Sequence, residues 1–206
     1  MRALVADAVD AAAELVGSDE VHARWDAPSA LEGMTVGALC AHLVRAAGSV
    51  IAYLDRTPPT DATTELLTPV SYFQAAIESP IHQRIKEVSA DEAAIGAADM
   101  SERCRALAIE LRARLAAEPV DRIVGALGAR RLSLDDFCRT RLVEVLLHVD
   151  DLAASVDAPR PDVDPEGPAI VSGILIDIAR NRVGDWTVLH ALARDERRAG
   201  TVFPVM

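Results

Sequence analysis

The chain has 206 residues, half of them hydrophobic and only 3% aromatic, so it is long enough to bury one sizeable core built from Ala, Leu, Val and Ile. Its formal charge of −11 disfavours nucleic acid as a partner, because an acidic surface repels phosphate groups. No uninterrupted apolar run reaches the roughly 18–20 residues that span a bilayer, and the N-terminus lacks the basic leader of a signal peptide. We therefore expect a cytoplasmic monomer or homodimer with no membrane partner.

The first half of the chain reads as helices separated by short loops. Apolar residues at helical spacing predict a helix over 2–16, which Gly17 ends. After a loop, Thr35 is a good N-cap for a second helix over 36–55. Two prolines at 58 and 59 end this helix and open a polar linker that reaches about residue 64.

The middle of the chain predicts further helices and one irregular segment. A helical pattern over 70–88 is interrupted by Pro80, and the residue before a proline is pushed out of helical geometry, so Ser79 marks a kink or break. A long helix is expected over 91–117. Residues 121–131 contain two glycines beside Ile and Val, which is typical of an extended loop or a short hairpin.

The last third begins with a helix capped by Ser133, where Asp136 takes the place of the Glu in a capping box. The remaining elements are this helix over 133–156, a proline-rich linker over 157–168, and two helices over 169–182 and 185–194, the last with Asp185 as N-cap. The sequence thus predicts an all-α fold: a four-helix bundle over 1–156, the linker, and a small helical C-terminal extension over 169–206.

The helix over 133–156 carries the most informative pattern. Glu144 and His148 are four residues apart and share one helix face, and Arg141 and Asp151 extend this charged stripe by one turn in each direction. Apolar residues surround the stripe. Burying a charged side chain without a partner costs on the order of several kcal/mol for each ion. The stripe is therefore expected to line a cavity.

A third candidate ligand, His42, lies on the core-facing stripe of the helix over 36–55. Two histidines and one glutamate form a ligand set that Zn²⁺ accepts, and three protein ligands leave one position open for water or substrate. Nickel, iron and manganese accept the same donors. The alternative to a metal site is that Glu144 and His148 form an ordinary ion pair along one helix and that His42 is a hydrogen-bonded core residue.

The cysteines and tryptophans have structural interpretations. The three cysteines, Cys40, Cys104 and Cys138, are far apart and form no C-x-x-C pair, so we expect reduced, buried thiols. Trp25 is expected to anchor the loop before the second helix, and Trp186 to anchor the C-terminal extension.

Two stretches carry a family resemblance: residues 25–48, WDAPSALEGMTVGALCAHLVRAAG, and residues 139–156, RTRLVEVLLHVDDLAASV. The residues that carry it are Trp25, Pro28, Ser29, Gly33, Thr35, Val36, His42 and Leu43 in the first stretch, and Arg141, Glu144, His148, Asp151 and Leu152 in the second. Both stretches resemble the signature regions of the mycothiol-dependent maleylpyruvate isomerase-like proteins, members of the wider DinB/YfiT-like superfamily of metalloenzymes.

The resemblance implies a DinB-like four-helix bundle in which His42, Glu144 and His148 hold a divalent metal, most readily zinc. It further implies a thiol transferase or isomerase that uses mycothiol on a small electrophilic substrate. In such an enzyme Arg141 either binds a substrate carboxylate or pairs with Glu144, and Asp151 either orients His148 or faces outward. The isomerase has a larger C-terminal domain than residues 169–206. A non-catalytic metal- or thiol-binding bundle, or a structural module, therefore stays open.

Overall fold

The computed structural model describes residues 1–56, 66–77, 81–126 and 130–194, together with Glu196, Val202, Pro204 and Val205. Its elements in chain order are α1 (Arg2–Val16), α2 (Asp19–Ala23), α3 (Val36–Leu54), α4 (Pro69–Ile77), α5 (Ile81–Ala93), α6 (Ala97–Ala117), β1 (Ile123–Ala126), β2 (Arg130–Ser133), α7 (Leu134–Val156), α8 (Glu166–Val183) and α9 (Asp185–Ala193).

Local capping explains where the two site-bearing helices begin. The Thr35 hydroxyl accepts a hydrogen bond from the Ala38 N–H at 3.1 Å, and the Ser133 hydroxyl accepts one from the Asp136 N–H at 3.0 Å. Each bond satisfies an N–H group that has no partner within its own helix. Both predicted caps are confirmed.

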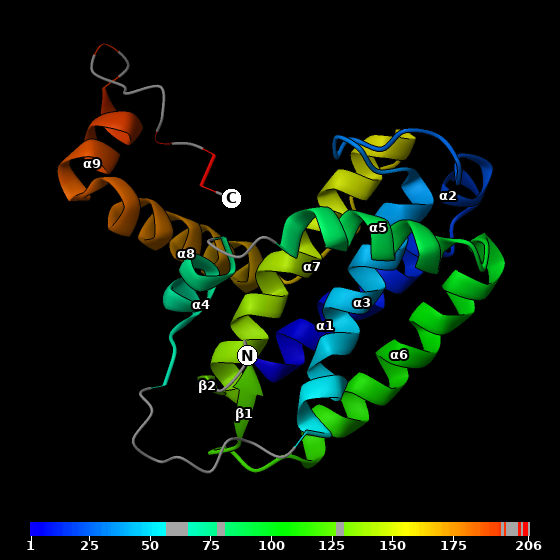
Figure 1. The fold of residues 1–206 in the computed structure, drawn as a ribbon, viewed down its shortest axis with the longest axis horizontal. Helices are drawn as coiled ribbons and strands as arrows, with labels where there is room; N and C mark the ends of the chain where they lie inside the picture. The colour runs from blue at the N-terminus through cyan, green and yellow to red at the C-terminus, as the bar shows by residue number, and fades with distance from the viewer. Residues whose placement is uncertain are drawn as a thin grey trace.

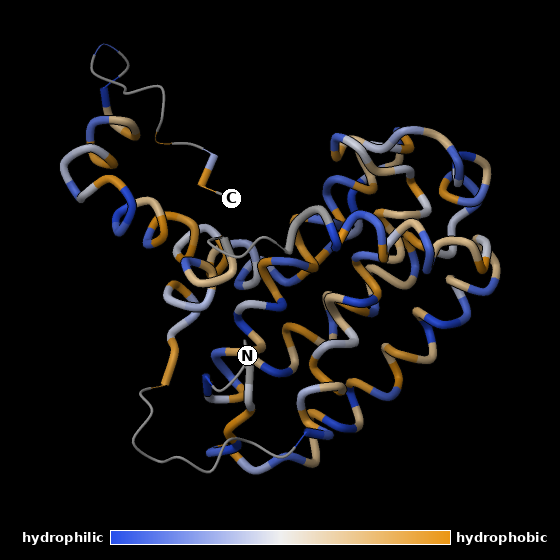
Figure 2. Tube along the Cα trace, viewed as in Figure 1, coloured by the Kyte–Doolittle hydropathy of each residue, from blue (hydrophilic) through white to orange (hydrophobic). Residues whose placement is uncertain are grey.

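Four long helices, α1, α3, α6 and α7, form the bundle (Figure 1). α1 packs against α6 and α7, and α3 packs against the same two helices. Hydrophobic residues recur along all four (Figure 2), and Val9, Leu39, Leu111 and Leu142, one from each helix, are at most 1% exposed. Burying such side chains is the main favourable term in folding. The predicted all-α, DinB-like bundle is thereby confirmed.

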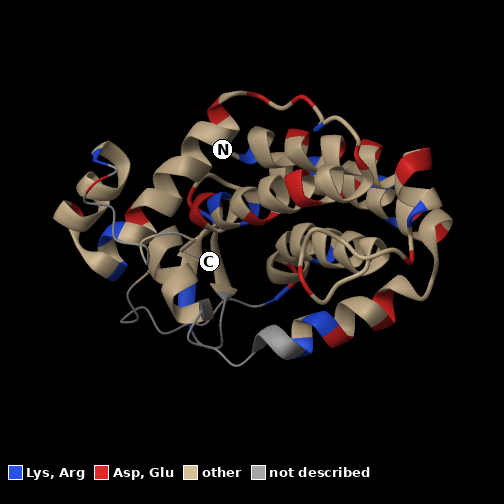
Figure 3. Cartoon of the chain, turned by 90° about the horizontal axis from the view of Figure 1, so that it is seen from above, with Lys and Arg blue, Asp and Glu red and all other residues tan. Residues whose placement is uncertain are grey.

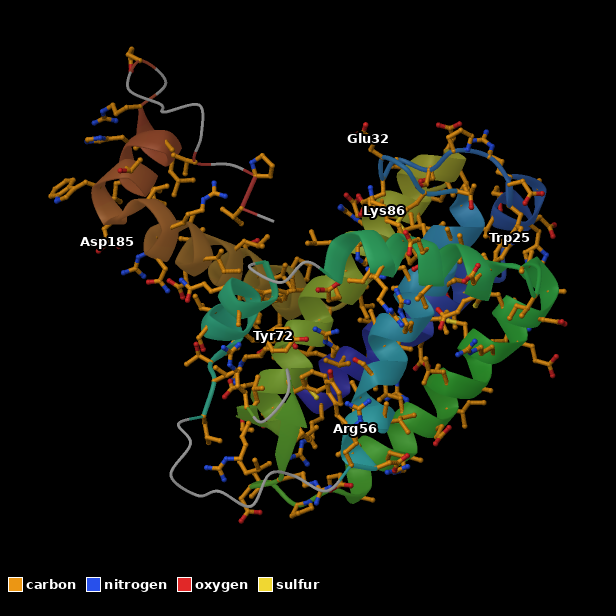
Figure 4. The ribbon with its side chains drawn as sticks, viewed as in Figure 1. Trp25, Glu32, Arg56, Tyr72, Lys86 and Asp185 are labelled. Carbon is orange, nitrogen blue, oxygen red and sulfur yellow. The ribbon has the colours of Figure 1, made fainter. Side chains whose placement is uncertain are left out.

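Two smaller elements complete the bundle. α5 crosses α3 on the front of the molecule (Figure 1), and the Lys86 ammonium ties it to the loop before α3 by donating to the Glu32 carbonyl at 2.8 Å (Figure 4). β1 and β2 pair antiparallel, with Ile123 opposite Ser133, and lead directly into α7. The segment predicted as a loop or hairpin is a hairpin.

The structure differs from the predicted helices at two places. The helix expected over 91–117 is divided between α5 and α6, because Gly96 has φ +90°, a left-handed conformation that glycine adopts without a steric penalty. The short helix α2 was missed; Ser18 caps it by accepting from the Val21 N–H. The linker expected over 57–64 and the break expected at Ser79 and Pro80 lie outside the described residues.

The C-terminal helices also begin differently from the prediction. α8 begins at Glu166 rather than 169, so the proline-rich segment is shorter; Pro168 is tolerated because first-turn N–H groups need no helical partner. Gly184, not Asp185, is the N-cap of α9. α8 and α9 form an arm that projects from the bundle (Figure 1). Trp186 on this arm is 75% exposed, so the packing role predicted for it was wrong.

α3 has the length and composition of a membrane-spanning helix. Most of it is nevertheless buried inside the protein, against α5, α6 and α7. A core helix of a bundle shows this same combination. Lys, Arg, Asp and Glu residues recur along several helices (Figure 3). Some of them join helices, as where Arg112 of α6 pairs with Asp7 and Asp10 of α1.

Candidate metal centre

The facing sides of α3 and α7 bring His42, Glu144 and His148 together. Glu144 and His148 follow one another by one turn of α7, and the His148 Nε2 atom lies 3.3 Å from Glu144 Oε2. The His42 Nε2 atom reaches across from α3 to within 3.8 Å of the same oxygen. The two imidazole rings meet edge to face with centroids 4.6 Å apart. The structure thus assembles the three residues that the sequence singled out.

The spacing of these donors fits a single metal ion. One ligand atom from each residue lies within 4.8 Å of the other two. Two donors at about 2.0–2.1 Å from a tetrahedral zinc ion would lie roughly 3.3 Å apart, so only small side-chain adjustments are needed. The side chains are half-buried, between 13% and 19% exposed, which leaves an approach for an exogenous ligand. Imidazole with carboxylate suits several divalent metals.

The pKa values in the metal-free centre follow from burial and from mutual contacts. Burial lowers the pKa of His42 to about 4, with a further contribution from His148. Burial alone would raise the pKa of Glu144, but the His148 hydrogen bond and the Arg141 charge lower it to about 2. Burial would likewise lower the pKa of His148, yet hydrogen bonds to Asp151 and Glu144 raise it to about 9. At neutral pH the His42 ring is therefore uncharged, whereas the His148 ring is protonated on both nitrogens and positively charged.

The two histidines have different partners at Nδ1. The Nδ1 atom of His148 lies 3.2 Å from Asp151 Oδ2, so Asp151 faces the centre, as one of its two predicted roles required. Carboxylates in this position orient a metal-binding histidine. At His42 the partner of Nδ1 is Arg45, whose Nη2 atom lies 3.0 Å away. Sequence reasoning missed Arg45, although its position three residues after His42 places both on one helix face.

Arg141 is buried beside the centre, 6% exposed, and forms no ion pair among the described residues. Its guanidinium donates to the Tyr72 hydroxyl at 3.1 Å and to the Thr140 hydroxyl at 3.2 Å, and its Nη1 atom lies 3.5 Å from the Ser49 hydroxyl. Tyr72, which sequence reasoning also missed, comes from α4 (Figure 4). The predicted alternative of an Arg141–Glu144 ion pair within 4 Å is not found within the described parts of the chain.

A groove of about 600 Å³ runs between α3 and α6 beside the centre. Arg45 and Ser49 line it, and these are the residues that contact His42 and Arg141. Its far end is marked by Arg56, which follows the C-terminus of α3 (Figure 4). A small molecule bound in this groove would therefore lie one side chain away from the metal centre.

The protein's own thiols are unsuited to chemistry at this site. Cys40, Cys104 and Cys138 are free and buried, as predicted. Burial raises the pKa of Cys104 and of Cys138 to about 12 and that of Cys40 further. A thiolate nucleophile at the centre would have to come from a bound thiol.

Comparison with known proteins places this centre in a family. The family model of the mycothiol maleylpyruvate isomerase N-terminal domain matches residues 5–153, from the fourth residue of α1 to three residues before the end of α7. Searches of curated proteins and of solved structures each gave no match. Because the match covers most of the chain, the protein belongs to the family of the mycothiol maleylpyruvate isomerase N-terminal domain.

Proposed function

We propose that this protein is a metal-dependent enzyme that uses mycothiol as thiol cosubstrate and acts on a small electrophilic molecule, as an S-transferase or an isomerase. The observation that carries the proposal is the cluster of His42, Glu144 and His148 ligand atoms within 4.8 Å of one another. The cluster lies in a domain whose family is linked to mycothiol. The proposed metal is zinc.

The charges around the centre suit a thiol reaction. A divalent ion bound there lowers the pKa of a coordinated thiol or water and orients it. In a loaded centre both histidines are neutral and Glu144 carries one negative charge, so the divalent ion with its three ligands has a net charge of +1 and attracts a thiolate. The half-buried setting strengthens this attraction because less water screens it.

Arg141 is the proposed substrate-binding residue. Its buried guanidinium is held by hydroxyl groups rather than by an ion pair among the described residues. A ligand carboxylate would supply a directly bonded counter-charge. Arg141 and the Tyr72 hydroxyl lie close enough together to bind one carboxylate jointly, since they already hydrogen-bond at 3.1 Å. The thiolate sulfur would then form a bond to the electrophilic carbon of a substrate that Arg141 holds by its carboxylate. In a transferase the leaving group departs with the displaced electron pair. In an isomerase that pair moves into the conjugated system of the substrate and returns to expel the thiolate after bond rotation.

One observation favours a second candidate function, a metal- or thiol-binding bundle without turnover. Of the elements that the structure describes, α9 packs mainly against α8, and the arm that they form projects away from the bundle rather than over the centre (Figure 1). A site that is not closed excludes water less well, which weakens electrostatic catalysis. Turnover measurements separate the two candidates.

The first experiment is elemental analysis of the purified protein and of a triple variant, His42→Ala with Glu144→Ala and His148→Ala. We expect about one metal ion per chain in the wild type, as three protein ligands imply, and none in the variant. His22→Ala, on the exposed part of α2, is the matched control and should retain the metal. Circular dichroism confirms folding. A wild type that holds no metal after incubation with Zn²⁺ and dialysis contradicts the proposal.

The second experiment measures turnover of mycothiol with two electrophiles of the same reactivity, one with a carboxylate and one without. Wild-type protein should consume both, and Arg141→Met should raise KM for the carboxylate compound by about tenfold or more, the effect of losing one charged contact. The same substitution should leave KM for the compound without a carboxylate unchanged. A metal-loaded wild type without turnover favours the binding protein.

A further inference from the structure

The two histidines of the centre differ in what their Nδ1 atoms contact. His148 Nδ1 faces the carboxylate of Asp151 at 3.2 Å, which accepts a proton. His42 Nδ1 faces the guanidinium of Arg45 at 3.0 Å. A guanidinium offers only N–H donors and cannot be deprotonated in a protein, so it can only donate to His42. One histidine has an acceptor at this position and the other has a donor.

This difference decides which ring nitrogen of His42 carries the proton. A neutral imidazole has one N–H donor and one acceptor nitrogen. Because Nδ1 accepts from Arg45, the proton lies on Nε2, the atom that faces Glu144 at 3.8 Å. A nitrogen that carries a proton has no free lone pair for a metal ion. Once Nε2 binds a metal, the proton moves to Nδ1, and Arg45 can no longer hydrogen-bond there.

We propose that Arg45 is a positioning residue that holds His42 in the tautomer unable to bind metal, so that metal loading requires Arg45 to leave His42. This inference rests on the proposed metal site. Most metal-binding histidines have an acceptor at the second nitrogen, and replacing such partners typically changes metal affinity by about 10–100-fold. Arg45 is the opposite kind of partner, and its removal should strengthen binding.

Arg45 has other partners that can hold it after release. Its Nη1 atom lies 3.7 Å from Glu92 Oε2, and its Nη2 atom donates to the Ser89 hydroxyl at 2.9 Å; both residues belong to α5. The groove between α3 and α6, which Arg45 lines, gives the guanidinium room to rotate. Metal loading at α3 is therefore coupled to the contact between α3 and α5 through a single side chain.

The proton position can be measured without any metal. Long-range ¹H–¹⁵N NMR spectra of the imidazole rings, recorded on metal-free wild-type protein at pH 7, distinguish Nε2–H from Nδ1–H histidines. We expect the neutral His42 ring to carry its proton on Nε2, and His42→Gln identifies its signals. A wild-type ring with the proton on Nδ1 overturns the proposal.

Metal affinity then tests the role of Arg45 itself, by competition for Zn²⁺ with a chromophoric chelator. Arg45→Gln, whose carbonyl can accept from Nδ1–H, should bind Zn²⁺ about tenfold more tightly than wild type. Arg45→Lys keeps the charge and the donor-only chemistry and should stay near the wild-type value.

A further variant separates the tautomer from simple charge repulsion. Arg45→Met removes the positive charge without supplying an acceptor, so its affinity should lie between those of wild type and Arg45→Gln. If Arg45→Met and Arg45→Gln bind Zn²⁺ equally well, charge alone explains the effect and the proposal is wrong; it is also wrong if Arg45→Gln binds no more tightly than wild type. Absence of Zn²⁺ binding in every variant contradicts the metal site instead, while the NMR result still reports on Arg45.

Discussion

At the scale of single residues, the centre combines groups whose protonation states differ strongly. The protonated His148 ring donates one N–H to Glu144 and the other to Asp151, and both carboxylates raise its pKa. His42, in contrast, has a guanidinium at one nitrogen and is neutral at physiological pH. Metal binding therefore requires a different change at each ring. His148 must lose a proton, and the proton of His42 must move from Nε2 to Nδ1.

The proton on His148 predicts how metal binding depends on pH. Metal binding displaces protons from its ligands. With pKa values of about 4 for His42, about 2 for Glu144 and about 9 for His148, only His148 is protonated between pH 6 and 8. Affinity for Zn²⁺ should therefore rise about tenfold per pH unit across this range, with about one proton released per ion. Calorimetry in two buffers of different ionisation enthalpy counts the protons. A flat profile would show that His148 is already neutral.

Asp151 offers a second prediction at this scale. Asp151→Asn keeps the shape of the side chain but removes the charge that orients His148 Nδ1–H, and we expect Zn²⁺ affinity to fall about tenfold. Its neighbour Asp150 is the matched control, because its carboxylate is exposed and pairs with Arg160 on the surface. Asp150→Asn should leave chelator-competition curves unchanged. If both substitutions lowered Zn²⁺ affinity equally, the negative charge of α7 as a whole, rather than the contact between Asp151 and His148, would explain the effect.

At the scale of secondary structure elements, α3 determines most of the site. It supplies His42 and Arg45, forms one wall of the groove, and packs on three other helices. Its start is fixed by the Thr35 cap and by Trp25, whose backbone carbonyl accepts from the Gly37 N–H at 2.8 Å. The Trp25 indole N–H donates to the Ala93 carbonyl of α5 at 3.3 Å. Trp25 lies against the first turn of α3, so the predicted anchoring role of this residue is confirmed.

Two glycines of α3 test this packing as a matched pair. A Cβ at position 37 would lie 2.5 Å from the Trp25 ring, whereas a Cβ at position 48 would meet Leu107 methyl groups at an ordinary 3.7 Å. Gly37→Ala should destabilise the protein by about 1–3 kcal/mol through overpacking. Gly48→Ala should stabilise it by about 0.5–1 kcal/mol, the gain from replacing a helical glycine. Urea unfolding gives both values. A neutral Gly37→Ala would show that Trp25 moves freely.

At the scale of the whole molecule, the bundle and the arm differ in how much they bury. Phe137, in the bundle, is fully buried, whereas Trp186, Leu189 and Leu192 of α9 are all more than half exposed. Asp185 marks the turn where α9 leaves α8 (Figure 4). The bundle therefore carries the stability of the protein, while this exposed face of the arm contributes little to it.

This contrast predicts the effect of removing two aromatic residues. Phe137→Ala should cost about 3–5 kcal/mol, the usual loss for a buried aromatic side chain. Trp186→Ala should change the free energy of unfolding by no more than about 0.5 kcal/mol, because an exposed side chain loses little contact. Urea denaturation of both variants, followed by circular dichroism, gives the comparison. A Trp186→Ala variant as unstable as Phe137→Ala would mean that the arm packs against the bundle in solution.

The sequence by itself determined the helices that bear the site, because their signals are local. The caps at Thr35 and Ser133, the helical spacing of apolar residues, and the four-residue interval between Glu144 and His148 all act within a few residues of the chain. His42 was a candidate ligand from its place on the core-facing stripe of its helix, and the family resemblance supported it as the third ligand. Local signals also existed where the prediction failed: Gly96 divides the helix expected over 91–117, and its left-handed conformation follows from the absence of a side chain.

Only the tertiary structure decided which side chains meet across helices. Nothing in the spacing along α3 fixes how α3 rotates against α7, so the 3.8 Å approach of His42 to Glu144 depends on bundle packing. The same holds for Tyr72, which reaches Arg141 from α4 over 69 positions of sequence. Trp186 was expected to be buried but is exposed. A large apolar residue is buried only where another element covers it, and α9 packs mainly against α8. Patterns in the chain specify faces of helices; the packing of those faces makes the site.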